Sequence, residues 1–383
     1  MATDWDTMPT NTEIAIIGGG VAGLCAAWFL ARAEHQVTIV ERAEPWGEAS
    51  GANAGTLSLQ VKIRPVLALA HRALLLWEEF EATMGTSVGF ARPGGLRVAT
   101  SDALADALRR SADRQREEGC DTQWLDRDAA HELAPWLGPS VQAATLCHDD
   151  GFSSPLLAGP ALIDAVRRAG AKLVSNAAVD AVERQADGFR LVTTDGAIAC
   201  KILVIAAGPG TTRIGQMLGV NLPLYADVDM LSVTEPAPPL LDRVVTHIGG
   251  VLSLKQHPNG TILIGGGWQG RGGYRSGRKD IDHDRFVQNL RVATETVPEL
   301  RRLRIVRAWA GFEAVAPDAL PYLGRLPGDK NAYVAAGARG GYHLAPVQGL
   351  LLSELIRDGA ASLPISAFDP GRYTAIVQHA RTT

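Results

Sequence analysis

The chain has few of the residues that metal clusters and disulfide frameworks need. Only four cysteines occur among 383 residues, at positions 25, 120, 147 and 200, and no two of them form a CxxC pair. This spacing argues against zinc sites, iron–sulfur sites and a disulfide framework. We therefore expect no metal centre and a reducing compartment.

The sequence also lacks an excess of basic charge and long apolar runs. The formal net charge is −4, so no overall positive field attracts phosphate backbones, and we expect no nucleic-acid partner. No uninterrupted apolar run approaches a membrane span, and residues 1–13 have neither the basic start nor the apolar core of a signal peptide. We expect a cytoplasmic protein without a transmembrane segment. The sequence does not exclude peripheral contact with a membrane.

What the chain does have is the length and composition of a globular protein with two domains or one large interleaved pair. Apolar strands at 14–17 and 37–40 flank a helix at 21–33, which is a βαβ unit. An amphipathic helix follows at 65–80. Residues 216–309 are mostly strands and loops, including a hairpin built on Asn259-Gly260.

A glycine-rich turn joins the first strand to its helix. Gly18, Gly20 and Gly23 form a GxGxxG pattern, in which the glycines permit a tight turn, approach of a pyrophosphate and close packing of helix on strand. The helix N-terminus would stabilise the phosphates. Glu41 ends the next strand, where a carboxylate accepts hydrogen bonds from ribose hydroxyls. The pattern therefore predicts a dinucleotide site.

A second GxGxxG pattern, at residues 265–270, also follows a strand. The sequence after it, RGGYRSGRKD, has no apolar helical period, so no helix N-terminus is available for a phosphate. We interpret it as the end of a hairpin. The chain then has one dinucleotide site. An enzyme that uses flavin and nicotinamide together usually needs two such sites, so a single site favours FAD as a cofactor that stays bound.

Five segments occur in order along the chain: IIGGGVAGLCAAWFLARAEHQVTIVER, EASGANAG, DGFSSPLLAGPAL, LVIAAGPGT and AGARGGYHLAP. Together they resemble the D-amino acid oxidase superfamily of FAD-dependent oxidoreductases. The chain is most similar to the glycine oxidase, sarcosine oxidase and D-amino acid dehydrogenase branch, including β subunits of opine and hydroxyproline dehydrogenases. The resemblance implies an α/β fold: a Rossmann-type FAD-binding domain (1–85, 151–215 and 310–383) interleaved with an α+β substrate domain built on an antiparallel sheet (86–150 and 216–309).

The resemblance also implies which residues contact FAD. In the N-terminal half these are Gly18, Gly20, Val21, Ala22, Gly23, Glu41, Arg42, Ser50, Asn53, Ala54, Gly55 and Val179. Later in the chain they are Ala207, Gly208, Gly337, Gly340, Gly341, His343, Leu344 and Ala345. Pro346 would begin a helix whose positive end faces the flavin ring. No His or Cys stands at the family's covalent attachment positions, so we expect noncovalent FAD.

In this family the flavin carries the redox chemistry. The resemblance implies oxidation of the C–N bond of an amino acid, N-substituted amino acid or opine by hydride transfer to flavin N5, giving an imine that hydrolyses. Leu263 stands where sarcosine oxidases present a lysine that assists oxygen, although Lys255 on the paired strand could compensate. One alternative is therefore a β subunit that relays electrons to a partner. A flavin monooxygenase is less favoured, because AAGARGGYHLAP lacks the Asp of its GD motif.

A substrate carboxylate needs a cation that makes two parallel hydrogen bonds, which is the geometry of arginine. Arg339 is the first candidate, and Lys62 and Arg64 rank below it. Glu313 stands where relatives carry a second arginine, after WAG. It is either a structural carboxylate or a sign of a substrate with an extra cationic group, such as an opine derived from arginine.

Three further residues are candidates for the catalytic site. Tyr342 and His343 adjoin Arg339 in the chain and could contact flavin or substrate, although His343 is equally well explained as a structural histidine. Tyr274 could cover the substrate pocket or simply pack in the core.

Overall fold

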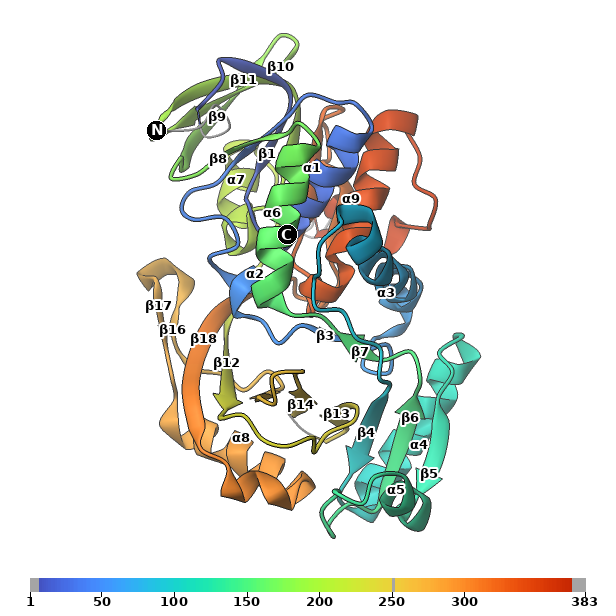
Figure 1. Ribbon diagram of the computed structural model, residues 1–383. Helices are drawn as coiled ribbons and strands as arrows, with labels where there is room; N and C mark the ends of the chain where they lie inside the picture. Colours follow the sequence, from blue (N-terminus) through green and yellow to red (C-terminus); the bar gives the residue numbers. More distant parts are fainter. Residues whose placement is uncertain (1–6, 250–251, 374–383) are drawn as a thin grey trace, which may run out of the picture.

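Two eight-stranded sheets organise the structure, a computed structural model that describes residues 7–249 and 252–373. The first sheet, in the upper part of Figure 1, has the order β19-β20-β11-β1-β2-β8, with β10 paired to β11 and β9 to β10. Its strands are β1 (Asn11–Ile17), β2 (Val37–Val40), β8 (Lys172–Val174), β9 (Val179–Gln185), β10 (Gly188–Thr193), β11 (Gly196–Ile205), β19 (Tyr322–Arg325) and β20 (Ala332–Ala336).

Helices and further strands cover both faces of β1, as expected for a parallel sheet. Ile14 and Ile16 pack into the core formed with the helices, whereas Ala15 and Ile17 pack into a second core with β9, β10 and α7 (Thr211–Met217). β1 lies parallel to both β2 and β11. The helices associated with this sheet are α1 (Val21–Arg32), α2 (Ala49–Ala52), α3 (Arg64–Met84), α6 (Pro155–Arg168) and α9 (Gly341–Asp358). The predicted βαβ unit is thus confirmed.

The second sheet has the order β18-β12-β15-β14-β13-β4-β6-β5 and lies below the first in Figure 1. Its strands are mostly antiparallel, but β13 and β4 are parallel. They are β4 (Gly95–Ala99), β5 (Gln123–Asp126), β6 (Ala143–Cys147), β12 (Tyr225–Thr234), β13 (Val244–His247), β14 (Ser253–Gln256), β15 (Ile262–Gly265) and β18 (Ile305–Val315). The predicted hairpin on Asn259-Gly260 is confirmed, since β14 and β15 pair across it and Gly260 has φ +84°.

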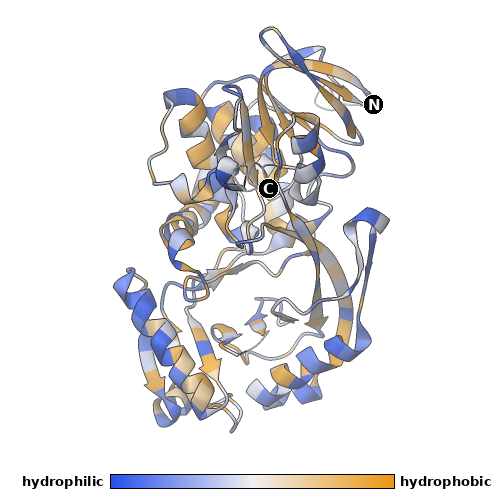
Figure 2. Cartoon of the chain, turned by 180° about the vertical axis from the view of Figure 1, so that it is seen from behind, coloured by the Kyte–Doolittle hydropathy of each residue, from blue (hydrophilic) through white to orange (hydrophobic). Residues whose placement is uncertain are grey.

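Three helices flank the second sheet: α4 (Asp102–Glu117), α5 (Arg127–Leu133) and α8 (His283–Thr296). The expectation that residues 216–309 are mostly strands and loops missed α8. This helix buries only Asn289, Ala293 and Thr296, so its sequence carries no strong apolar stripe. Asp282 caps it by accepting a hydrogen bond from the Arg285 amide. Seen from behind in Figure 2, α4 at the lower left is likewise largely hydrophilic.

Two further sheets of the described structure are short pairs of strands. β3 (Thr56–Leu57) pairs with β7 (Gly151–Phe152), and β16 (Arg271–Gly273) pairs with β17 (Arg278–Asp280). β18 crosses residue 310, where the predicted domain boundary lies; the division into domains stays a prediction. Among the described residues no helix is both long and apolar enough to cross a membrane.

Candidate active site

A cavity of about 1850 Å³ lies where the glycine-rich turn of the first sheet meets the face of the second. Single small-molecule sites have volumes of roughly 300–1,000 Å³. The cavity therefore has room for a dinucleotide and a substrate together.

The glycine-rich turn has the close contacts that the sequence predicts. Gly18 has φ +113°, a conformation that side chains disfavour. A Cβ atom on Gly23 would lie 1.9 Å from the Gly18 carbonyl oxygen, so this glycine lets α1 pack on β1. Gly20 precedes α1 and faces the cavity, where a Cβ atom would meet only Ser50 Oγ, at 3.1 Å. The positive end of α1 is thereby open to a phosphate.

Glu41 lies at the end of β2 and lines the cavity. Its Oε2 accepts a hydrogen bond from the Gly19 amide at 2.7 Å, and its Oε1 accepts one from the Ala43 amide at 3.0 Å. These bonds fix the carboxylate beside the glycine-rich turn.

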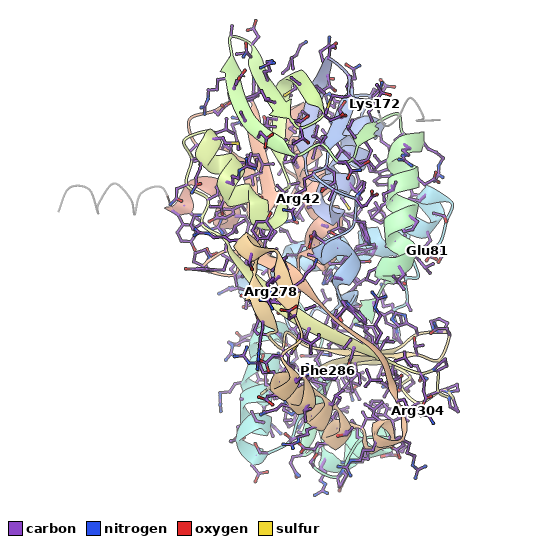
Figure 3. The ribbon with its side chains drawn as sticks, turned by 90° about the vertical axis from the view of Figure 1, so that its left-hand side faces the viewer. Arg42, Glu81, Lys172, Arg278, Phe286 and Arg304 are labelled. Carbon is purple, nitrogen blue, oxygen red and sulfur yellow. The ribbon has the colours of Figure 1, made fainter. Side chains whose placement is uncertain are left out.

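Tyr274 belongs to the hairpin of β16 and β17, which extends toward the first sheet. Arg42 Nη1 donates a hydrogen bond to the Tyr274 hydroxyl at 2.9 Å. Figure 3 shows Arg42 above Arg278 of β17 in this region. Tyr274 therefore lies beside Arg42, at the end of the cavity where the resemblance expects adenine.

Residues 49–56 form a tightly bonded turn on the cavity wall. Asn53 donates to the Ser50 carbonyl and accepts from the Gly55 amide, both at 2.6 Å, and Ser50 Oγ accepts from the Val21 amide at 2.8 Å. Lys255 Nζ donates to the Ala54 carbonyl at 2.6 Å. The polar side chains of this segment thus hold its backbone in place, and the backbone lies on the cavity wall.

The C-terminal helix begins earlier than the sequence analysis expected. α9 starts at Gly341, after Gly340 in a left-handed conformation with φ +65°, so Pro346 lies inside the helix and does not begin it. A proline in the second turn loses one helical hydrogen bond without ending the helix at its own position. The helix N-terminus therefore lies at the cavity wall, while Leu344 and Ala345 are buried away from the cavity.

Tyr342 and His343 lie in the first turn of α9 and are held by protein partners. The Tyr342 hydroxyl lies 2.7 Å from Ser153 Oγ, and its ring stacks on Trp77. His343 Nε2 lies 2.9 Å from the Ala70 carbonyl, which only accepts, so Nε2 carries the proton. Burial lowers the pKa of His343 well below its usual value, which keeps the imidazole neutral.

Arg339 lies among three carboxylates at the cavity wall. Its Nη1 donates to Glu313 Oε2 at 2.8 Å and lies 3.7 Å from Asp229 Oδ2, and its Nη2 bonds to Asp227. Asp227 and Glu313 are a register pair on β12 and β18. Glu313 Oε1 also accepts from the Gly340 amide at 2.8 Å. We call Asp227, Asp229 and Glu313 the acidic cluster.

The acidic cluster carries more negative charge than Arg339 neutralises. Burial, followed by the charge of Glu313, raises the pKa of Asp229 to about 7. Lys62 also lines the cavity, and burial lowers its pKa to about 8. Arg64 is different: its side chain is 84% exposed and lies 3.5 Å from Glu118, away from the cavity.

The structure brings most of the predicted site residues together around the cavity. Gly23, Leu344 and Ala345 do not line it. The predicted residues that do line it are Gly18, Gly20, Val21, Ala22, Glu41, Arg42, Ser50, Asn53, Ala54, Gly55, Val179, Ala207, Gly208, Tyr274, Glu313, Gly337, Arg339, Gly340, Gly341, Tyr342 and His343. Sequence reasoning missed Arg97 and Thr246, which also line it and come from strands far apart in the chain.

A model of the family described as FAD dependent oxidoreductase matches residues 13–355 of the chain. The chain belongs to this family. Glycine oxidase of Geobacillus kaustophilus (strain HTA426) is 31% identical over 96% of this chain and 98% of its own length. An opine oxidase subunit of Rhizobium meliloti is 26% identical over 95% of this chain and 98% of its own length.

Solved structures show the same relationship. The crystal structure of L-proline dehydrogenase from P. horikoshii has a TM-score of 0.89 and 26% identity, covering 96% of this chain and 99% of that one. The glycine oxidase structure from G. kaustophilus has a TM-score of 0.87 and 29% identity, covering 95% and 99%. The predicted fold class and the assignment as an FAD-dependent oxidoreductase are confirmed.

The residues around the cavity fit FAD. Gly20 leaves a cradle at the N-terminus of α1 that a Cβ atom would begin to fill, and the Glu41 carboxylate is fixed beside it. Bound there, FAD would supply the two-electron acceptor for substrate oxidation. The backbone of residues 49–56 and the loop before α9 would hold it between the two sheets. That the FAD is noncovalent stays a prediction.

Proposed function

We propose that this enzyme oxidises the C–N bond of an amino acid or N-substituted amino acid that carries an additional cationic group. The observation that supports this proposal is the acidic cluster, whose three carboxylates share one guanidinium inside the cavity. A carboxylate in a partly dehydrated site binds a cation more strongly than it would in water. Above pH 7, where Asp229 is ionised, a substrate guanidinium or ammonium group would offset the excess charge.

Arg339 stays the candidate for the substrate's α-carboxylate. Its Nε has no hydrogen-bond partner among the described residues, and the side chain is 46% exposed. The acidic cluster binds Nη1 and Nη2. These ion pairs fix the orientation of the guanidinium, including the side that carries Nε. Arg339 would thus position the carboxylate, and the acidic cluster would hold the cationic group.

The relatives support an amine substrate. One is a glycine oxidase and another is a subunit of an opine oxidase. An opine derived from arginine contains a secondary amine, carboxylates and a guanidinium, which match the groups that the cavity offers. Oxidation removes the Cα hydrogen with its two electrons, as a hydride, and a proton from the nitrogen. Water then hydrolyses the resulting imine to a carbonyl compound and an amine.

The electron acceptor is a further part of the proposal. Leu263 is buried and pairs in register with Lys255 on β14, so no lysine occupies the position at which sarcosine oxidases present one. We therefore favour a dehydrogenase, acting alone or as a subunit that passes electrons to a partner.

Anaerobic bleaching of the flavin absorbance tests the function. The substrates are matched pairs that differ in one charge: N-alkyl derivatives of arginine against those of citrulline, with both enantiomers of each. We expect reduction by the arginine series and an affinity loss of about 10- to 100-fold for the citrulline series, the cost of one charge-assisted hydrogen bond. Equal affinities would reject the cationic group. If no amine reduces the flavin although the FAD content is normal, the relay subunit is favoured. Bleaching by a reduced nicotinamide dinucleotide alone would favour a monooxygenase.

A further inference from the structure

A row of polar side chains crosses the second sheet on the side that faces the cavity. Ser253 on β14 pairs in register with Thr246 on β13, and Thr246 pairs in register with Arg97 on β4. All three residues line the cavity. Residues in register on neighbouring strands project to the same face, so these side chains are neighbours.

Two members of this row have buried polar atoms without a partner. Arg97 Nε and Thr246 Oγ1 make no hydrogen bond within the described structure. Arg97 Nη1 donates to the Gln60 carbonyl at 2.8 Å and to Ser111 Oγ at 3.4 Å, while Nη2 has no partner among the described residues. Unpaired donors of a partly buried guanidinium are costly, and an anion would satisfy them.

Asp150 is the carboxylate whose charge acts on Arg97, but other groups already donate hydrogen bonds to it. Asp150 accepts hydrogen bonds from Ser58 Oγ at 2.6 Å, from the Leu59 amide at 2.7 Å and from Gln60 Nε2 at 2.9 Å. It is not within ion-pair distance of Arg97, although its charge favours the protonated guanidinium. No carboxylate of the described chain therefore pairs with Arg97 directly.

His247, beside Thr246, is a neutral imidazole and does not offset the charge of Arg97 either. Its Nδ1 lies 3.1 Å from the Gly249 amide and accepts from it, so its Nε2 donates to Thr100 Oγ1 at 3.0 Å. Burial, and then the charge of Arg97, lowers the pKa of this imidazole. Arg97 thus brings a positive charge to this wall, and among the described residues it forms no ion pair with a carboxylate.

Arg97 and Arg339 are associated with different strands of the second sheet. Arg339 contacts β12, and β15, β14 and β13 lie between β12 and β4 in the sheet. At about 4.8 Å between neighbouring strands, four steps place the backbones of β12 and β4 about 19 Å apart. Arg97 and Arg339 therefore belong to different parts of the cavity wall, which suits a substrate that carries two carboxylates.

We propose that Arg97, with Thr246 beside it, binds a second carboxylate of the substrate. The inference rests on the proposed function and names its substrate class: an N-(carboxyalkyl) amino acid, with one carboxylate at Arg339 and the other at Arg97. The guanidinium Nη2 and Nε and the threonine hydroxyl donate to this second carboxylate. The acidic cluster holds the cationic side chain at the opposite wall.

The test compares two substrates that differ in this carboxylate alone, N-(1-carboxyethyl)arginine and N-ethylarginine. Dissociation constants come from the concentration dependence of anaerobic flavin reduction by the FAD-loaded enzyme. Arg97→Met should reduce the preference for the dicarboxylate about 10- to 100-fold, with a smaller reduction in Arg97→Lys and in Thr246→Val. Arg190→Met is the control, because Arg190 lies on β10 outside the cavity and pairs with Glu183.

Glutarate, a dicarboxylate without an amine, makes the test independent of turnover. Binding of glutarate should perturb the flavin spectrum of the wild type. The Arg97→Met variant should bind glutarate more weakly while it retains the FAD content and melting temperature of the wild type. The inference is overturned if Arg97→Met weakens both arginine derivatives equally, or if glutarate binding is absent from the wild type or unchanged in the variant. By contrast, a wild type that binds glutarate through Arg97 but is reduced by no amine refutes the proposed function and leaves the anion site standing.

Discussion

Lys255 Nζ lies 2.6 Å from the carbonyl oxygen of Ala54 and the same distance from Thr56 Oγ1. The lysine is fully buried on β14, and no carboxylate of the described residues pairs with it. It therefore connects the second sheet to the turn at residues 49–56 on the cavity wall. Burial lowers the pKa of its ammonium group to about 7.

This burial predicts a pH-dependent stability. Between pH 7 and the unfolded lysine pKa of about 10.4, the unfolded chain binds the proton more tightly than the folded chain. The contribution of Lys255 to the free energy of unfolding should therefore rise with pH over this window. Urea unfolding of the wild type and of Lys255→Met at pH 7 and pH 9.5 checks this: the stability of the wild type relative to the variant should increase. A constant difference between the two proteins would contradict the lowered pKa.

Gly20 and Gly23 should respond differently to the same substitution. Gly23→Ala forces a Cβ atom against the Gly18 carbonyl at 1.9 Å, so we expect a stability loss of about 1–3 kcal/mol or more and a lower Tm. Gly20→Ala meets only Ser50 Oγ at 3.1 Å and places a methyl group on the path of a phosphate. It should keep the Tm of the FAD-free protein and lose FAD affinity. Similar melting curves for the two FAD-free variants would argue against this division of roles.

Glu41 should determine FAD affinity. Its carboxylate is fixed by the Gly19 and Ala43 amides, and a ribose would donate to it. Glu41→Ala should weaken FAD binding by about 10- to 100-fold, measured by titrating the FAD-free protein, because it removes charge-assisted hydrogen bonds. Glu44→Ala, at an exposed position three residues later, is the matched control. An unchanged affinity in Glu41→Ala would remove Glu41 from the FAD site.

Features that depend on residues close together in the chain could be predicted from the sequence. The first βαβ unit, its glycine-rich turn and the hairpin at Asn259-Gly260 are local patterns, in which residue type and spacing specify the backbone. The polar helix α8 was missed, because tertiary contacts stabilise a helix whose apolar stripe is weak. The start of α9 was placed too late, because Pro346 also tolerates a position inside the helix.

Relationships between distant strands could not be predicted from the sequence. Glu313 was noted for its position after WAG, but its contact with Arg339 depends on the pairing of β12 with β18. Arg97 alternates within GLRVAT like any strand residue, and its role depends on the register with Thr246. Such registers are set by the whole sheet, and single-sequence patterns do not contain them.

The acidic cluster predicts a pH-dependent preference for cationic substrates. Asp229 has a raised pKa of about 7 and faces Glu313, Asp227 and Arg339. Below pH 7 it is protonated and neutral, and above pH 7 its ionisation adds one negative charge to the cluster. The preference for an arginine derivative over the matching citrulline derivative should therefore rise by about tenfold between pH 6 and pH 8.

The ratio of the two dissociation constants isolates this effect, because the reacting amine titrates alike in both substrates. Lys62, with a pKa lowered to about 8, is the other group that changes charge nearby. Losing its positive charge at higher pH would also favour a cation, so Lys62→Met is a necessary comparison and should keep the step near pH 7. Asp229→Asn cannot ionise and should flatten the step while the FAD stays bound. If the step persists in Asp229→Asn and disappears in Lys62→Met, the pH dependence belongs to the lysine, and Asp229 does not hold the cationic group.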